Sequence, residues 1–154
     1  MLNVHIIRMN SEDIPEAAAL EREVFPDPWS EAMLRSGMAE HSQLYFCARE
    51  KSGALAGYAA MLAVLDEGEL LRIGVAPGFR RRGVAAMLLE RIFQTAEERK
   101  LASMLLEVRK GNTPAVRLYE KYGFSSEGIR KNYYQNPEED ALIMKKMFAA
   151  GENP

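Results

Sequence analysis

Residues 69–99 have the sequence ELLRIGVAPGFRRRGVAAMLLERIFQTAEER, and this stretch decides the fold. Its first part, Glu69 to Val75, is rich in aliphatic residues and predicts a strand. A turn follows at Ala76-Pro77-Gly78, and then comes the basic run Arg80-Arg81-Arg82. The next residues, from about Val84 to Arg99, carry apolar side chains at helical spacing: Ala85, Leu88, Leu89, Ile92 and Ala96. The stretch therefore predicts a strand, a loop and an amphipathic helix in that order.

A second strand is expected directly after this helix, from Ser103 to Val108. A strand, a helix and a strand in this order form a right-handed crossover between two parallel strands. Further strands are expected at Val4–Arg8, Leu44–Arg49, Leu55–Leu62, Phe124–Tyr134 and Asp140–Met147. We expect the last two to form an antiparallel hairpin, which makes the sheet a mixed one.

Three more helices are indicated by capping residues before apolar residues at helical spacing. Asn10–Asp13 precedes the first, which is broken at Phe25–Pro28, and Ser30 can cap the second. Thr113 can cap the third, with Pro at its first position and Gly123 just past its end. The class is therefore α/β, with a mixed sheet and about four helices.

Length and composition bound the kind of protein. With 154 residues we expect one compact domain over residues 1–148 and a flexible tail over residues 149–154. Apolar residues make up 47% and charged residues 27%, which is ordinary for a globular protein. The net charge of −2 creates no field that attracts nucleic acid, and no apolar run is long enough for a membrane span. We therefore expect neither nucleic-acid nor membrane binding.

Cysteine and histidine usage points to a cytoplasmic protein without a metal. Cys47 is the only cysteine, so the chain has no internal disulfide, and the apolar run around it predicts a core position. The first residues lack the pattern of a signal peptide. His5 and His41 are far apart and have no cysteine neighbours, so we expect no metal site.

The loop Arg80–Ala85 lies between a strand and a helix start, and it predicts a diphosphate site. Amides in the first turn of a helix have no partner in the helix, and the helix dipole there favours an anion. Gly83 permits close approach of the backbone, and the arginines add bidentate phosphate donors. A solvated basic helix start is the competing interpretation.

Gly74 interrupts a strand that otherwise carries larger side chains. Glycine at such a position marks a bulge, or a place where a ligand nears the backbone. A small residue beneath a packed helix is the alternative. Strict alternation would place Leu71, Ile73 and Val75 on one face, with Leu70 and Arg72 on the other.

The chain resembles the GCN5-related N-acetyltransferase (GNAT) superfamily. Arg80-Arg81-Arg82-Gly83-Val84-Ala85 matches its coenzyme A signature, (Gln/Arg)-x-x-Gly-x-(Gly/Ala), and the order of elements matches over essentially the whole chain. A narrower resemblance, to the ribosomal-protein-alanine N-acetyltransferases (the RimI type), rests on four segments. These are Phe25–Ser30, Leu106–Arg109, Asn112–Phe124 and Ile129–Tyr134.

The resemblance implies a mostly antiparallel mixed sheet with one splayed parallel strand pair. It implies acetyl-CoA as cosubstrate, no metal, and a protein N-terminus as acceptor, typically the N-terminal alanine of a small-subunit ribosomal protein. By position, Glu107 matches the general base and Tyr119 the general acid. The implied coenzyme contacts are Ile73, Gly74, Val75, Arg80, Arg81, Arg82, Gly83, Val84, Ala85, Ala86, Asn112 and Tyr119.

The acceptor side is expected to involve Trp29, Arg72, Tyr133 and Tyr134. Arg72 stands where the family often has a smaller polar residue, as Gly74 stands where alanine is common and Ala85 where glycine often sits. Adjacent tyrosines on a strand point to opposite faces, so only one of Tyr133 and Tyr134 is required at the site. Which of them faces the acceptor stays open.

Each catalytic assignment has a structural alternative. Glu107 could form a surface ion pair, Tyr119 could be a core residue, and Glu69 is the nearest other carboxylate. Two other functions also remain open from the residues alone. One is acetylation of a small-molecule amine or a lysine side chain, and the other is binding of acyl-CoA without turnover.

Overall fold

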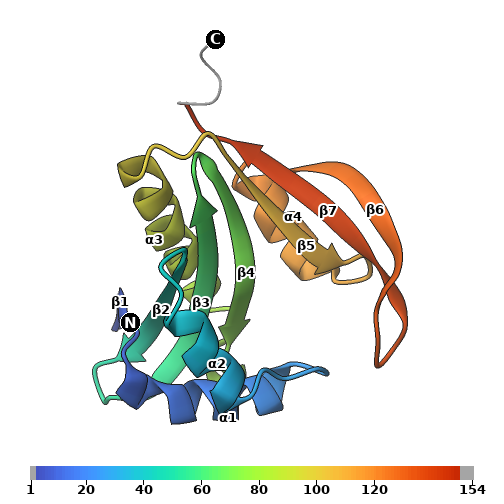
Figure 1. The fold of residues 1–154 in the computed structure, drawn as a ribbon. Helices are drawn as coiled ribbons and strands as arrows, with labels where there is room; N and C mark the ends of the chain where they lie inside the picture. The colour runs from blue at the N-terminus through green and yellow to red at the C-terminus, as the bar shows by residue number, and fades with distance from the viewer. Residues whose placement is uncertain (1–2, 150–154) are drawn as a thin grey trace.

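The computed structural model of the protein describes residues 3–149. The helices and strands follow in this order: β1 (Val4–Arg8), α1 (Ile14–Val24), α2 (Glu31–Met38), β2 (Gln43–Glu50), β3 (Leu55–Val64), β4 (Glu67–Val75), α3 (Val84–Glu98), β5 (Ser103–Arg109), α4 (Thr113–Lys121), β6 (Ser125–Tyr134) and β7 (Glu139–Met147). The predicted element order is confirmed (Figure 1). The predicted tail lies, apart from Ala149, outside the described residues.

The strands form one sheet in the order β1-β2-β3-β4-β5-β7-β6. The pair β4–β5 is parallel, and the other neighbouring pairs are antiparallel. Helix α3 makes the crossover between the two parallel strands, as the strand–helix–strand pattern predicted. The predicted mixed, mostly antiparallel sheet is therefore confirmed.

The parallel pair is short and opens into a fork. Pairing of β4 with β5 runs only from Glu67 opposite Ser103 to Leu70 opposite Leu106. Beyond these residues β4 continues to Val75 and β5 to Arg109 without pairing to each other. Figure 1 shows β5, β6 and β7 swinging away from β4 below this point. The splay leaves the main chain of β4 unpaired on its β5 side from Leu71 onward.

A bulge in β4 changes which side chains share a face. Arg72 lies opposite Ala60 and Leu70 lies opposite Met61, so Leu71 is the extra residue. Leu70 and Ile73 therefore pack in the same core cluster, whereas Leu71 packs in the cluster on the other face. The predicted grouping of Leu71 with Ile73 was wrong because alternation fails across a bulge.

Gly74 is not the bulged residue, since Gly74 pairs regularly with Tyr58. A Cβ atom at Gly74 would lie 2.9 Å from the ring of Phe25 and 3.5 Å from Val24. Close packing against the end of α1 accounts for this glycine, which is the alternative that the sequence left open.

Two hydrophobic clusters lie on opposite faces of the sheet. One packs α3 and α4 on the sheet through residues such as Leu88, Leu106 and Tyr119. The other packs α1 and α2 on it and includes Cys47 and Tyr58. Cys47 is fully buried, and burial raises the pKa of its thiol to about 11, with a contribution from Asp13. None of the described helices is long and apolar enough to cross a bilayer.

Candidate active site

A cleft of about 490 Å³ begins where β4 and β5 separate. It is bordered by the α1–α2 connection, the two splayed strands, the start of α4 and the end of β6. The cleft collects these residues predicted from sequence: Trp29, Arg72, Ile73, Glu107, Asn112, Tyr119, Tyr133 and Tyr134. Five segments of the chain thus converge on one hollow.

The basic loop leads into the first turn of α3. Gly83 is the N-cap residue with a φ of +83°, and Arg81 also has a positive φ of +61°. No side chain caps this helix. The first main-chain hydrogen bond of the helix runs from the N–H of Met87 to the carbonyl oxygen of Gly83. Within residues 3–149, the amides of Val84, Ala85 and Ala86 therefore have no partner.

The side chains of this loop divide into two kinds. Arg80, Arg81 and Arg82 are exposed, and the Arg82 guanidinium stacks on Phe79 at 5.2 Å. The side chain of Val84 is buried in the core, so only its amide is available to a ligand. Free amides with flanking guanidinium groups match the donors that a diphosphate requires.

Glu107 points into the cleft because its neighbours Leu106 and Val108 pack in the core on the other face. Its Oε2 lies 3.4 Å from Nε of Arg130, which is an ion pair. The geometry does not make a hydrogen bond, and Oε2 is buried without a hydrogen-bond partner in the part of the chain that the structure describes. A carboxylate oxygen held in this way can accept a proton from a cationic group.

Glu69 lies on the same face of the sheet as Glu107. Glu69 is opposite Leu105 in the parallel pair, and Glu107 follows two residues later on that strand. Burial and then the Glu107 carboxylate raise the pKa of the Glu69 carboxyl, while Arg130 opposes the rise. The cleft therefore holds two carboxylates, of which Glu69 gives up its proton less readily than an exposed glutamate does.

Tyr119 is both a core residue and a cleft residue. It is 6% exposed, and its ring meets that of Phe124 edge-on at 5.8 Å between centroids. It also lines the cleft, and no hydrogen-bond partner of its hydroxyl lies among the described residues. Burial raises the pKa of this hydroxyl above the ordinary tyrosine value. Tyr119 thus stays a phenol, able to donate a proton, well into alkaline solution.

Tyr133 and Tyr134 both line the cleft, contrary to the expectation of opposite faces. The pairing of β6 with β7 is irregular between Arg130 and Tyr134, and Asn132 has a positive φ of +54°. Alternation fails there, and the two rings meet edge-on at 5.0 Å. Burial and then Glu107 raise the pKa of Tyr134 to about 12.

Asn112 caps α4, so the prediction that Thr113 is the cap was wrong by one residue. The Oδ1 atom of Asn112 accepts from the amide of Ala115 at 3.4 Å, and Thr113 is the first helical residue. The side-chain amide nitrogen of Asn112 is not used in this cap, and the residue lines the cleft. Asn112 therefore retains donors that a ligand can engage.

Arg109 was not among the site residues predicted from the sequence. It anchors the tip of the β6–β7 hairpin. Its guanidinium donates to the carbonyl oxygens of Gln135 at 2.6 Å and Pro137 at 2.8 Å, and it stacks on Tyr134 at 4.6 Å. The side-chain amide of Asn136 donates to Asp27 at 3.0 Å. This contact joins residues far apart in sequence, and no local pattern could reveal it.

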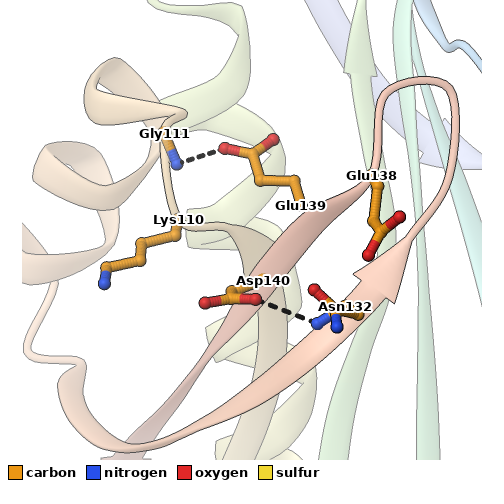
Figure 2. Close-up of a pocket in the computed structure, with 6 residues that line it drawn as sticks. All are labelled: Lys110, Gly111, Asn132, Glu138, Glu139 and Asp140. Atoms are coloured by element: carbon orange, nitrogen blue, oxygen red, sulfur yellow. Dashed lines mark hydrogen bonds between the residues drawn. The ribbon is translucent and has the colours of Figure 1, made fainter.

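A second hollow, of about 460 Å³, lies between this hairpin and the loop after β5 (Figure 2). There Glu139 accepts from the amide of Gly111 at 2.7 Å, and Asp140 accepts from the amide of Asn132 at 2.9 Å. These two carboxylates hold the loop after β5 and the bulged end of β6. The acidic segment 136–140 thus has a structural role in this hairpin.

Known proteins of similar sequence identify the family of this chain. The model of the acetyltransferase (GNAT) family matches residues 14–124. The [ribosomal protein bS18]-alanine N-acetyltransferase of Escherichia coli (strain K12) is 38% identical over 141 residues, covering 90% of this chain and 94% of that protein. The chain belongs to the acetyltransferase (GNAT) family. Both the superfamily and the type that the sequence resembles are thereby confirmed.

Solved structures agree with this assignment. The crystal structure of the ribosomal-protein-S18-alanine N-acetyltransferase from Escherichia coli superposes on the GNAT protein described here with a TM-score of 0.89. The two are 36% identical, and the match covers 98% of each chain. NAA60 of Arabidopsis thaliana in complex with acetyl-CoA shares the fold, with a TM-score of 0.86 at 17% identity, over 95% of this chain and 99% of that one.

GNAT acetyltransferases use acetyl-CoA, and the donor set of this member fits that cosubstrate. The free amides at the start of α3 suit its diphosphate. The unpaired edge of β4 from Leu71 to Val75 suits the amide groups of its pantetheine arm. The loop follows the end of β4 after a short 3-10 turn, Pro77–Phe79, so the two features are adjacent along the chain. Of the predicted coenzyme contacts, Gly74, Val75 and residues 80–86 do not line the cleft itself.

Replacing Gly83 by Val in this acetyltransferase is expected to weaken coenzyme A binding about 10-fold or more, because a β-branched residue resists a positive φ by roughly 1–2 kcal/mol or more. The turn would then rearrange and its amides would turn away. Gly78→Val is the matched control, because a Cβ at either glycine meets nothing within 4 Å and Gly78 has no positive φ. Calorimetric titration with coenzyme A measures the affinity of both variants. Equal affinities would show that Gly83 does not shape the diphosphate site.

Proposed function

We propose that this acetyltransferase moves the acetyl group of acetyl-CoA to the N-terminal α-amine of a protein, with the N-terminal alanine of a small-subunit ribosomal protein as its acceptor. The relatives of highest identity reported above are named for that activity on bS18. The observation that carries the proposal is that Glu107 and Tyr119 line the same cleft at the fork of β4 and β5.

An attacking amine must first lose a proton. An α-amino group has a pKa near ~8 and a lysine side chain near ~10.4, so the N-terminus is the easier nucleophile to prepare at neutral pH. Glu107 attracts the ammonium in place of Arg130 and takes its proton, directly or through one water. The neutral nitrogen then attacks the acetyl carbonyl carbon.

Acetyl-CoA supplies the thioester, whose C–S bond breaks as the new C–N bond forms. Tyr119 donates its hydroxyl proton to the departing sulfur. Free thiols and phenols have pKa values near ~8.5 and ~10, so this transfer is uphill for Tyr119 and more so after burial. The proton taken up by Glu107 passes to solvent, as does the second proton that the nitrogen loses when it becomes the amide. Tyr119 regains a proton from solvent and is a phenol again.

The pH dependence follows from these groups. For an alanine-initiated peptide, kcat/KM should rise with pH up to about 8, as the α-amine loses its proton, and then stay level to about pH 10. The raised pKa of Tyr119 keeps the acid protonated, so it produces no fall within that range. Initial rates at saturating acetyl-CoA measure this profile. A fall in kcat/KM beginning near pH 8 would contradict the role of Tyr119 as the acid.

Mass spectrometry of a panel of acceptors incubated with acetyl-CoA and the purified protein tests the proposed acceptor. The panel contains short peptides that begin with alanine, the same peptides with a blocked N-terminus and an internal lysine, and free polyamines. Fast acetylation of the alanine-initiated peptides alone supports the proposal. Transfer chiefly to polyamines or lysine overturns the acceptor class, and binding without any transfer overturns the enzymatic role.

A further inference from the structure

Glu21 is a carboxylate buried beneath the acceptor end of the cleft. It lies on α1 with a fully inaccessible side chain. Its Oε1 atom accepts from the amide of Trp29 at 2.8 Å, and its Oε2 atom accepts from the hydroxyl of Tyr58. An ionised buried carboxylate is stable only when it is paired and fully hydrogen-bonded. The partner that pairs with Glu21 is Arg72.

Arg72 reaches Glu21 through two nitrogen atoms. Nη2 lies 2.5 Å from Oε1 and Nε lies 2.9 Å from Oε2, which is a bidentate pair. Nη2 also donates to the carbonyl oxygen of Asp27 at 3.0 Å. The guanidinium therefore ties a buried carboxylate on α1 to the main chain of the α1–α2 connection.

Two aromatic rings enclose this guanidinium. Its central carbon lies 3.7 Å from the centroid of Phe25 and 4.8 Å from that of Trp29. Phe25 in turn presses on the strand at Gly74, where a Cβ would lie 2.9 Å from its ring. Arg72 and the segment Phe25–Trp29 thus form one packed wall of the cleft.

The bulge in β4 makes this arrangement possible. Because Leu71 is the extra residue, Leu71 and Arg72 both lie toward α1 instead of on opposite faces. The Arg72 side chain can therefore fold back on Glu21 while it still lines the cleft. It lines the cleft on the expected acceptor side, but it is held against Glu21 and does not extend freely into the cleft.

The ion pair with Glu21 also neutralises the charge of Arg72 at this wall. A free guanidinium in the cleft would repel a cationic acceptor amine, and it would fill space that the acceptor needs. Held against Glu21, Arg72 is neutralised by a carboxylate that the cleft does not expose. Glu69 and Glu107 then remain available to attract the ammonium.

We propose that the Glu21–Arg72 pair is the positioning element that sets acceptor specificity, by fixing the wall Phe25–Trp29 so that the cleft admits only a small first side chain. This inference rests on the proposed N-terminal acetyltransferase function. The cleft of about 490 Å³ must receive both the thioester and the acceptor end, and the rigid wall limits what remains beside the amine. Neither residue takes part in proton transfer.

Glu21→Gln is the principal test, because it keeps the shape of Glu21 but removes the charge that holds Arg72. Its one carbonyl oxygen can still accept from the amide of Trp29, and its NH2 group can donate to the hydroxyl oxygen of Tyr58. We expect the acceptor KM to rise and the preference for alanine-initiated over leucine-initiated peptides to fall about 10-fold, the order of magnitude that pocket contacts provide. The kcat for the alanine peptide and the affinity for coenzyme A should stay unchanged. Glu23→Gln, an exposed position on the same helix, is the control.

A second readout needs no acceptor at all. Trp29 is the only tryptophan in the chain, so its fluorescence reports directly on this wall. Acrylamide quenching should increase in Glu21→Gln and remain unchanged in Glu23→Gln. Arg72→Lys keeps a cation beside Glu21, which favours folding. It lacks the planar guanidinium that reaches Asp27 and stacks on Phe25. It should shift peptide preference and quenching in the same direction.

The outcomes separate this inference from the proposed function. Wild-type peptide preference and wild-type quenching in either variant would overturn the positioning role. So would a fall in kcat and coenzyme affinity with an unchanged acceptor KM, because that pattern marks general structural damage. Failure of the unmodified protein to acetylate any N-terminal peptide would overturn the proposed function, whereas the quenching comparison would still test the pair.

Discussion

Glu107→Gln is expected to lower kcat for an alanine-initiated peptide about 1,000-fold, within the range that general acid–base catalysis provides. The glutamine amide has nearly the shape of the carboxylate but cannot take a proton from the ammonium. It also removes the ion pair with Arg130, whose exposed side chain can move into solvent. Steady-state kinetics at saturating acetyl-CoA measure the loss.

Coenzyme binding should survive this change, because Glu107 lies on β5 and the free amides belong to the start of α3. The matched control is Glu69→Gln, which removes a second carboxylate from the same face of the cleft. We expect that variant to keep most of the activity. The reverse pattern, with Glu69→Gln inactive and Glu107→Gln active, would transfer the base role to Glu69.

Tyr119→Phe is expected to lower kcat about 100-fold, because the sulfur must then leave without a positioned proton donor. The substitution removes one oxygen and keeps the ring, so the edge-on contact with Phe124 persists. Stability should change little, since the hydroxyl has no hydrogen-bond partner among the described residues. Thermal unfolding and steady-state kinetics on the same preparation separate the two effects.

Tyr122→Phe is the control for this experiment. Tyr122 follows α4 directly, and its hydroxyl donates to Glu90 at the surface, at 3.0 Å, away from the cleft. That variant should retain full activity. A Tyr119→Phe enzyme that turns over at the wild-type rate would leave Tyr119 with only its packing role, the alternative that its burial would otherwise favour.

The fold can be predicted from the sequence because it is specified locally. The strand, loop and amphipathic helix between Glu69 and Glu98 are each specified by neighbouring residues, and the crossover rule then makes the pair parallel. Glu107 and Tyr119 were found because they occupy positions in motifs of a family. Their geometry in the cleft agrees with that assignment.

The parts that the sequence did not reveal depend on register and on distant contacts. The bulge at Leu71 and the irregular pairing before Tyr134 leave no local mark, yet each moves a side chain to the other face. No local pattern marks Glu21 as a buried, paired carboxylate, because its partner Arg72 is 51 residues away. Such pairs become visible only when the sheet brings the segments together.

The central claim is that unpaired amides at the start of α3 hold the diphosphate of coenzyme A beside the fork of β4 and β5. Calorimetric titration with coenzyme A and with pantetheine, which lacks the diphosphate, tests this claim most directly. We predict saturable binding of one coenzyme A per chain, much weaker binding of pantetheine, and a loss in Gly83→Val that affects coenzyme A alone. Absence of coenzyme A binding, or equal affinity for the two compounds, would contradict it.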